Sequence, residues 1–526
     1  MANKLSAETL STIFEYLTKE QLFPIAFVNK LWCNSVVRVL WRSPFQFYNE
    51  LIDDEYEENE KDEEKIKKGS AVIRTLMTFL GEDDKKLLVE QGLELPPKPE
   101  KPTDSALAFN YPSFIIVFEY TNILLSIEDW LDTSTKLQHQ SDQYKILHEE
   151  IFKTLSKLIF AESPGIDELT CTTSYKLDLF TIPNAVNCLS KITKFSGDFI
   201  NISKEFFIAA SQHCVGIKHL SLHQCTDDEV LTDFIVNQQK LETLEIKGID
   251  EPLPEVIEVI KRKSSTLKKL VIEEVISLSP TLLVGLENLE EFRLKHFYDP
   301  TSEDIQEFSE TMEGIAETRF NNLTSLHLLI DEADPEILAR ILENTDMKLK
   351  SFTLSYLKFE GELDANDLWE AIAGFCPVLE KLHLETFQLS EVLNGLPTIF
   401  GGCILLRALT ISEHKEGEGE YGPFDISDEF AILGPLVPPA LQILDLSQAD
   451  AICTPQALEE FLEGCVERLN KPLLLKLDSQ YLEPTHSDVL HLFGEEGFNE
   501  SGNENSRERI FTIFPRPNSD AADNEQ

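Results

Sequence analysis

The sequence is poor in basic residues and has no long apolar run. Its 526 residues include 46 lysines and arginines against 93 aspartates and glutamates, which gives a formal net charge of −47 at pH 7. Such a charge repels phosphates at long range, so we expect no nucleic-acid partner. The best apolar candidate, Phe114 to Ile127, is shorter than the roughly 18 residues of a membrane span and contains Glu119. We therefore expect no membrane partner either.

Cysteine is scarce and shows no pairing pattern. The nine cysteines form no CxxC pair and no spacing typical of a disulfide framework. The N-terminus also lacks a basic stretch followed by an apolar segment and a small-residue cleavage site, so we expect no secretory signal. These observations favour reduced, mostly buried thiols in a protein that is cytoplasmic and/or nuclear.

Catalytic and cofactor-binding arrangements are not visible in the sequence. No Ser/His/Asp, catalytic Cys/His, Walker-type or HExxH arrangement occurs, and with 93 acidic residues paired carboxylates arise by coincidence. We therefore predict a protein that is not an enzyme and that needs no cofactor.

What the sequence does have is a repeat. An apolar pattern spaced i, i+3, i+5 recurs ten times between residues 217 and 477. It begins with Ile217-x-x-Leu220-x-Leu222, and its degenerate last copy is Pro472-x-x-Leu475-x-Leu477. Two weaker copies begin at Ile166 and Ile192. The ten copies start 22 to 35 residues apart, near the roughly 20–29 residues of leucine-rich repeats, and we expect loop insertions in the longer units.

Each repeat has an apolar strand edge and an apolar helix face that it cannot bury alone, so the repeats must stack. The predicted fold class is therefore α/β, a leucine-rich-repeat solenoid over residues 161–495 in the form of a horseshoe of parallel strands with outer helices. The residues between the repeated apolar positions should line its concave side. Surfaces of this kind bind proteins more often than they catalyse reactions.

The N-terminus forms a separate helical module, predicted over residues 1–48. Leu10, Ile13, Phe14 and Leu17 have helical spacing, and further apolar clusters follow between Leu22 and Trp41. About forty residues cannot bury this many large apolar groups internally, so part of the module's surface should contact a partner.

The residues of this module resemble an F-box. The resemblance covers Leu5-Ser6-x-Glu8-x-Leu10-x-x-Ile13-Phe14-x-x-Leu17, then Leu22, Val28-Asn29-Lys30-x-Trp32 and Leu40-Trp41-Arg42. The usual F-box opens with Leu-Pro and has Val-Cys-Lys, where this chain has Leu5-Ser6 and Val28-Asn29-Lys30. The repeats also resemble those that accompany F-boxes, in which Cys-Pro-x-Leu precedes the strand, as Cys376-Pro377-Val378-Leu379 does here. Cys214 and Cys403 occupy related places.

This resemblance implies a small three-helix F-box module that docks onto the Skp-type adaptor, and through it the cullin, of an SCF-type ubiquitin ligase. The leucine-rich repeats would hold an unknown protein substrate for ubiquitination and proteasomal degradation. The alternative is a leucine-rich-repeat scaffold of the ribonuclease-inhibitor kind, whose N-terminal helices merely cap the solenoid. The adaptor-binding residues that the resemblance implies are Leu5, Leu10, Ile13, Phe14, Leu17, Leu22, Val28, Trp32 and Trp41.

Three further segments complete the predicted organisation. Residues 49–104 are expected to be an acidic and Pro-rich linker with short helices at Ala71–Leu80 and Lys85–Leu88. Residues 105–160, with a strand at Phe114–Phe118 and a helix at Tyr144–Phe160, should cap the first open edge of the solenoid. Residues 496–526 should be a disordered tail.

Two motifs suggest sites that we do not favour. His213, Cys214, His219, His223 and Cys225 offer zinc donors, but they lack the usual short C-x₂₋₄-C spacing, so we predict no metal. The stretch Gly417 to Gly422 satisfies GxGxxG, but its glutamates would repel a pyrophosphate and Pro423 follows it. An acidic insertion loop is the better interpretation.

The strand positions expected to face the concave side include several cations in a very acidic chain. They could receive an acidic or phosphorylated partner segment. Charge for solubility is the interpretation we favour. These substrate-binding candidates are Lys269, Arg293, His327, Lys381, His383 and Arg407.

Overall fold

The computed structural model describes most of the chain, which divides into two compact units, Met1–Leu241 and Glu242–Gln526. Among the described residues, no helix is long and apolar enough to cross a membrane. Two parts of the predicted linker, residues 49–62 and 94–104, and the glycine-containing stretch 417–422 lie outside the described residues. The described residues are 5–46, 63–93, 109–135, 137, 141–171, 178–198, 202–224, 228–249, 254–275, 281–296, 304–330, 334–357, 365–386, 389–413, 423–497 and 508–516.

Unit 1 begins with three short helices, α1 (Ala7–Phe14), α2 (Lys19–Ile25) and α3 (Lys30–Leu40). Ser6, Thr18 and Asn29 cap them, each accepting a hydrogen bond from the backbone N–H three residues further on. Since capping residues and apolar spacing agree, the helices begin where the local sequence dictates. Their shared core consists of Leu10, Phe14, Leu22 and Val36.

Further helices and one strand follow in unit 1: α4 (Glu63–Thr78), α5 (Glu82–Glu90), η3 (Tyr111–Phe114), β1 (Val117–Glu119), α6 (Tyr120–Ser134) and α7 (Asp142–Glu162). The strand predicted at Phe114–Phe118 starts later, because Pro112 favours the turn of η3. Residues 63–93 are more than a linker, since Ile73, Leu76 and Leu88 are fully buried.

The first repeats of unit 1 alternate strands and helices. Their elements are β2 (Glu168–Cys171), η4 (Leu179–Thr181), α8 (Ala185–Leu189), β3 (Lys194–Asp198), α9 (Lys204–His213), β4 (His219–His223) and α10 (Asp228–Asn237). Strands β1 to β4 pair in parallel in chain order. The two weaker repeats at Ile166 and Ile192 are thus part of the array, and β1 covers its first edge.

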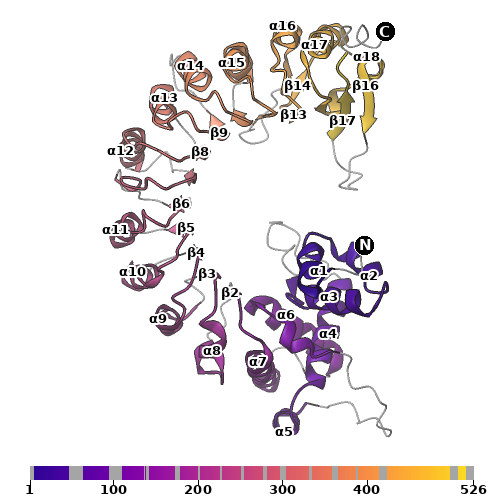
Figure 1. Ribbon diagram of the computed structural model, residues 1–526, viewed down its shortest axis with the longest axis vertical. Helices are drawn as coiled ribbons and strands as arrows, with labels where there is room; N and C mark the ends of the chain where they lie inside the picture. The colour runs from indigo at the N-terminus through magenta and orange to yellow at the C-terminus, as the bar shows by residue number, and fades with distance from the viewer. Residues whose placement is uncertain are drawn as a thin grey trace. The chain divides into compact units, whose positions relative to one another are not determined.

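Unit 2 continues the same alternation, and Figure 1 shows its strands on the inner side of its curve and its helices on the outer side. Strands β5 to β11, then β13 and β15, pair in parallel in chain order. A separate two-stranded sheet pairs β12 (Phe424–Asp425) with β14 (Ala451–Ile452). The main strands are β5 (Thr243–Ile249), β6 (Lys269–Val275), β7 (Glu291–His296), β8 (Ser325–Ile330), β9 (Ser351–Leu357), β10 (Lys381–Thr386), β11 (Ala408–Glu413), β13 (Ile443–Gln448) and β15 (Leu473–Asp478).

The outer helices of unit 2 are α11 (Pro254–Arg262), α12 (Asp304–Ala316), α13 (Pro335–Glu343), α14 (Asn366–Phe375), α15 (Leu389–Gly402), α16 (Ser427–Leu433), η5 (Gly434–Leu436), α17 (Pro455–Arg468), η6 (Ser479–Tyr481) and α18 (Pro484–Phe493). Neighbouring helices approach closely at two glycines. A Cβ added at Gly434 would collide with the carbonyl of Phe461, and one added at Gly464 would collide with Pro435. The rings of Phe430 and Phe461 stack there with centroids 4.0 Å apart.

The repeated apolar residues form the core of the array. In the repeat that contains β8, Leu323, Leu326 and Leu328 are fully buried, while Ser325 and His327 alternate with them on the other side of the strand. We call that other side of the sheet, away from the buried leucines, the inner face. A period of two along each strand therefore separates core from surface.

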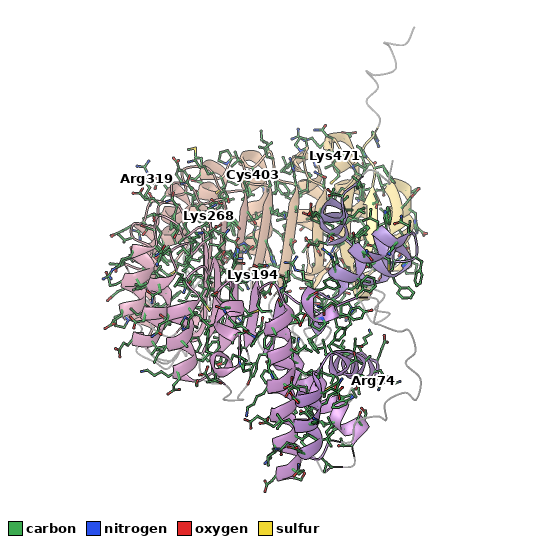
Figure 2. The ribbon with its side chains drawn as sticks, turned by 60° about the horizontal axis from the view of Figure 1, so that its bottom comes forward. Arg74, Lys194, Lys268, Arg319, Cys403 and Lys471 are labelled. Carbon is green, nitrogen blue, oxygen red and sulfur yellow. The ribbon has the colours of Figure 1, made fainter. Side chains whose placement is uncertain are left out.

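Buried cysteines end several of the outer helices. Cys403, labelled in Figure 2, follows α15, and its Sγ lies 3.5 Å from the carbonyl oxygens of Ile372 and Cys376 in the preceding repeat. Cys214 Sγ lies 3.3 Å from the carbonyl oxygen of Leu189 in the same way. Burial raises the pKa of Cys214, Cys376 and Cys403 to about 12. The thiols of Cys214 and Cys403 thus contact carbonyl oxygens of the preceding repeat, and all three thiols stay protonated.

The C-terminal end of unit 2 is closed by two antiparallel strands, β16 (Gly494–Gly497) and β17 (Glu508–Ile513). Strand β17 pairs with β15, placing Leu475 opposite Phe511, and β16 pairs with β17. Phe511 and Ile513 are fully buried. The predicted disorder of the tail is therefore wrong for residues 508–516, because these apolar side chains cover the last open edge of the sheet.

Candidate functional site

Seven large apolar side chains are exposed between residue 5 and residue 31, in the first three helices and the chain beside them. They are between 38% and 86% exposed, whereas most apolar residues of the repeats are buried. Phe23 and Phe27 contact each other edge to face, with ring centroids 5.3 Å apart. We call the following residues the N-terminal apolar group: Leu5, Ile13, Tyr16, Phe23, Phe27, Val28 and Leu31.

The structure divides the predicted adaptor-binding residues into two classes. Leu10, Phe14 and Leu22 are buried in the core of the module, with Leu17 and Trp32 packed against them. Leu5, Ile13 and Val28 are exposed. The first class can only support a docking surface, while the second can contact a partner directly.

Trp41 lies apart from both classes. Its ring packs on Tyr111 of η3, with centroids 4.4 Å apart. It therefore joins the helical module to the cap of the solenoid.

Sequence reasoning did not assign a role to Tyr16, Phe23, Phe27 or Leu31. The runs of consecutive apolar residues in this segment could have shown that some of them are exposed. Consecutive residues of a helix point about 100° apart, so they cannot all face one core. Leu22 is buried, so its neighbour Phe23 has to point elsewhere.

The end of α3 is attached to the first strand of the array. The backbone N–H groups of Ile116 and Val117 both donate to the carbonyl of Arg42, at 3.1 Å each. The Arg42 guanidinium lies 2.8 Å from Glu15 and 3.7 Å from Asp167. A pocket of about 360 Å³ lies at this junction, lined by Leu17, Leu22, Glu119 and others. The attachment holds the module on the cap and leaves the N-terminal apolar group exposed.

On the inner face of unit 2, the predicted cations of β6 and β7 are neutralised by carboxylates. Lys269 Nζ lies 3.0 Å from Glu291 and 3.8 Å from Glu245, on the strands to either side. Arg293 Nε lies 2.9 Å from Glu273. These ion pairs remove most of the positive charge that an acidic partner segment would need.

The other inner-face candidates are less charged than their residue types suggest. Burial lowers the pKa of His327 and of His383, so both rings are neutral at pH 7. The Nε2 atom of His327 lies 2.8 Å from Ser325 Oγ, and that of His383 lies 3.2 Å from Ser412 Oγ. Lys381 is exposed and has no carboxylate partner within the described ranges. The candidates therefore do not form a cationic stripe.

Arg407 is not an inner-face residue. It precedes β11, whose first residue Ala408 pairs with Lys381, and its guanidinium lies 3.3 Å from Glu380, which occupies the same place before β10. The prediction that it belongs with Arg293 and His383 is wrong, because Arg407 lies two residues before the buried Leu409, and the alternation of period two places it on the same side as Leu409.

The residues of the zinc alternative are only partly described. The ring of His213 packs beside Phe180, and Cys214 contacts the carbonyl of Leu189. Cys225 lies outside the described residues. Wherever the structure describes side chains, no group of three or more His, Cys, Asp or Glu residues is placed to hold a metal ion.

Comparisons with known proteins add little to this picture. No family model matches the sequence, and no curated protein matches it. Among solved structures, the chain is similar to an internalin (inlF) from Listeria monocytogenes at 12% identity, with a TM-score of 0.33, over 58% of this chain and 79% of that one. We take no functional argument from a likeness of this size. The leucine-rich-repeat solenoid follows from the parallel strands, outer helices and buried leucines of this chain itself.

Proposed function

We propose that this protein is the substrate-recruiting, non-catalytic subunit of an SCF-type ubiquitin ligase. In this proposal the N-terminal helices dock onto a Skp-type adaptor and through it a cullin, and the repeats hold the protein to be ubiquitinated. The observation that carries the proposal is the exposure of the N-terminal apolar group on helices whose sequence resembles an F-box.

The physical support is a burial argument. A fully buried large apolar side chain stabilises a complex by about 1.5–3 kcal/mol relative to an exposed one. Ile13, Phe23 and Phe27 leave much of this free energy unused in the isolated chain. A helical adaptor surface that covers them would gain it.

The proposed work of the chain is positioning. Holding a substrate near a ubiquitin-charged enzyme raises the effective concentration of its lysines, which requires no catalytic group on this chain. We propose a cytoplasmic and/or nuclear location, which agrees with the eight described cysteines, none of which forms a disulfide.

The test is capture of a purified Skp-type adaptor by the full-length protein. Ile13→Asp and Phe27→Asp should each weaken capture at least tenfold, because a carboxylate cannot be buried in an apolar interface without a partner. The matched control is Leu492→Asp on α18, since Leu492 is 73% exposed and Phe27 is 74% exposed. The control should capture as well as the unchanged protein.

A protein that fails to capture the adaptor, or variants that capture it unchanged, would reject the ligase proposal. Leu10→Asp is unsuitable for this test because Leu10 is buried, so loss of capture would report unfolding of the module.

The alternative is a leucine-rich-repeat scaffold without a ubiquitin-ligase role. The observation that favours it is the attachment of Arg42 to Ile116 and Val117, which suits helices that cap the solenoid. The same capture experiment decides between the two, since a cap predicts no adaptor binding.

A further inference from the structure

The inner face of unit 2 carries ion-pair networks near both of its ends. One network lies on β5, β6 and β7, where Lys247 Nζ also lies 3.1 Å from Glu273. The other joins β13, β15 and β17, where Lys476 Nζ lies 3.2 Å from Asp445 and 2.7 Å from Glu508. A second chain that covered these networks would remove the water that still hydrates their charges, and this desolvation opposes binding.

The strands between these networks carry mainly uncharged polar side chains. Register places His327, Thr353, His383 and Thr410 side by side on β8, β9, β10 and β11. Among the side chains that the structure describes, Lys381 and Glu385 are the charged residues that alternate onto the inner face of these four strands. We call the following residues the hydroxyl–imidazole patch: Ser325, His327, Ser351, Thr353, His383, Thr410 and Ser412.

This patch can donate and accept hydrogen bonds without carrying charge. A hydroxyl donates one hydrogen and accepts others, and a neutral imidazole has one donor and one acceptor. Each of the two rings uses its Nε2 atom on a serine. The side chains of Thr353 and Thr410 have no hydrogen-bond partner among the residues that the structure describes. The patch therefore offers unused hydrogen-bonding groups in the middle of the inner face.

The size of the patch suits a short extended segment. Neighbouring strands lie about 4.8 Å apart, so four strands span about 14 Å. An extended chain advances about 3.3 Å per residue, so about four or five residues cross the patch.

We infer that the hydroxyl–imidazole patch binds an extended, uncharged segment of a partner protein, rich in Ser, Thr, Asn and Gln. The inference rests on the proposed role of the repeats in holding a protein. An acidic or phosphorylated segment would meet one unpaired lysine on a chain of net charge −47. A basic segment would meet the single carboxylate of Glu385. In both the acidic and the basic segment, the other charged side chains would be buried on the patch without partners. Interface centres are depleted in charge for the same reason.

The test is selection of seven-residue peptides from a random display library on the full-length protein, followed by affinity measurement for the selected peptides. We expect enrichment of uncharged sequences rich in Ser, Thr, Asn and Gln. Thr353→Glu and Thr410→Lys, of opposite charge, should each weaken the selected peptides at least tenfold. Thr243→Glu, on the inner face of β5, is the matched control and should change affinity less than twofold.

Selection of acidic or basic peptides, no enrichment at all, or equal weakening by Thr243→Glu would overturn the inference. So would a charge effect of one sign only, because electrostatic attraction would then explain the binding. The Thr353→Glu and Thr410→Lys proteins should unfold at the same urea concentration as the unchanged protein, which shows that their repeats are folded. Their capture of the Skp-type adaptor should also be unchanged. Adaptor capture thus tests the ligase proposal, and peptide selection tests the patch.

Discussion

The N-terminal helical module and the repeats of unit 2 differ in how far their apolar residues are buried. In the repeats, the leucines of each pattern are buried and the inner face carries ion pairs, hydroxyls and imidazoles. In the module, four residues form the core while Tyr16, Phe23 and Phe27 remain exposed. The difference follows from size, because a stack buries each repeat against its neighbours and three short helices cannot. The exposed apolar residues of the module are therefore the surface on which the proposed adaptor would dock.

The largest expected effect tests the buried side of this comparison. Phe352 on β9 is buried in the core of the array, so Phe352→Ala should lower the free energy of unfolding by about 3–5 kcal/mol. The adjacent Thr353 faces the inner side, and Thr353→Ala should change the free energy by less than about 1 kcal/mol. Urea denaturation followed by circular dichroism measures both. Equal effects would contradict the assignment of the two faces.

A second prediction separates the core of the module from its exposed residues. Leu10→Ala should cost at least about 2 kcal/mol and speed amide hydrogen exchange in α1 and α3, because Leu10 is buried between them. Ile13→Ala should leave exchange nearly unchanged, since Ile13 is exposed. Hydrogen exchange measured by mass spectrometry on the full-length protein checks this. Strong deprotection by Ile13→Ala would show that Ile13 belongs to the core.

A third prediction uses the buried thiols. Burial raises the pKa of Cys376 to about 12, so in the folded protein it stays a thiol where an ordinary cysteine ionises. The raised pKa of Cys376 adds to the free energy of unfolding. This addition is fully present below about pH 8.5, the pKa of the thiol in the unfolded chain, and is lost as the pH rises toward 12. At pH 8.5 iodoacetamide should modify partly exposed Cys33 much faster than Cys376, and urea should remove the difference. Equal rates in the native protein would contradict the buried helix-end position of Cys376.

The smallest expected effect concerns the two imidazoles of the inner face. Burial lowers the pKa of His327 and His383, so protonation favours the unfolded chain. Their contribution to stability is present above the unfolded pKa of about 6.5 and is lost as pH falls below it. The free energy of unfolding should therefore decline less between pH 7.5 and pH 5.5 in the His327→Asn/His383→Asn protein than in the unchanged one. Identical pH profiles would place both rings in open solvent.

The repeat architecture could be predicted from sequence because its signal is local. The i, i+3, i+5 pattern places one residue before each strand and two on the buried side of it, so strands such as β8 and β10 fall where the leucines require. The C-terminal edge was missed for the opposite reason. Strand β17 is stable only because Phe511 and Ile513 reach a core made by residues far earlier in the chain.

For the candidate sites too, local spacing predicted part of the outcome and contacts between elements decided the rest. Exposed Leu5, Ile13 and Val28 were among the predicted contact residues, while Leu10, Phe14 and Leu22, predicted with them, are core residues. Helical spacing identifies an apolar face but does not say which side of it a neighbouring helix covers.

The sequence by itself determined the solenoid, its parallel strands and the three N-terminal helices, because period, apolar spacing and capping residues act over a few residues of chain. Only the tertiary structure decided that Lys269 and Arg293 are neutralised and that an uncharged patch remains between two ion-pair networks. The physical reason is strand register. It brings side chains from successive repeats within a few ångströms of one another, and the exact starting residue of each strand sets which of them meet.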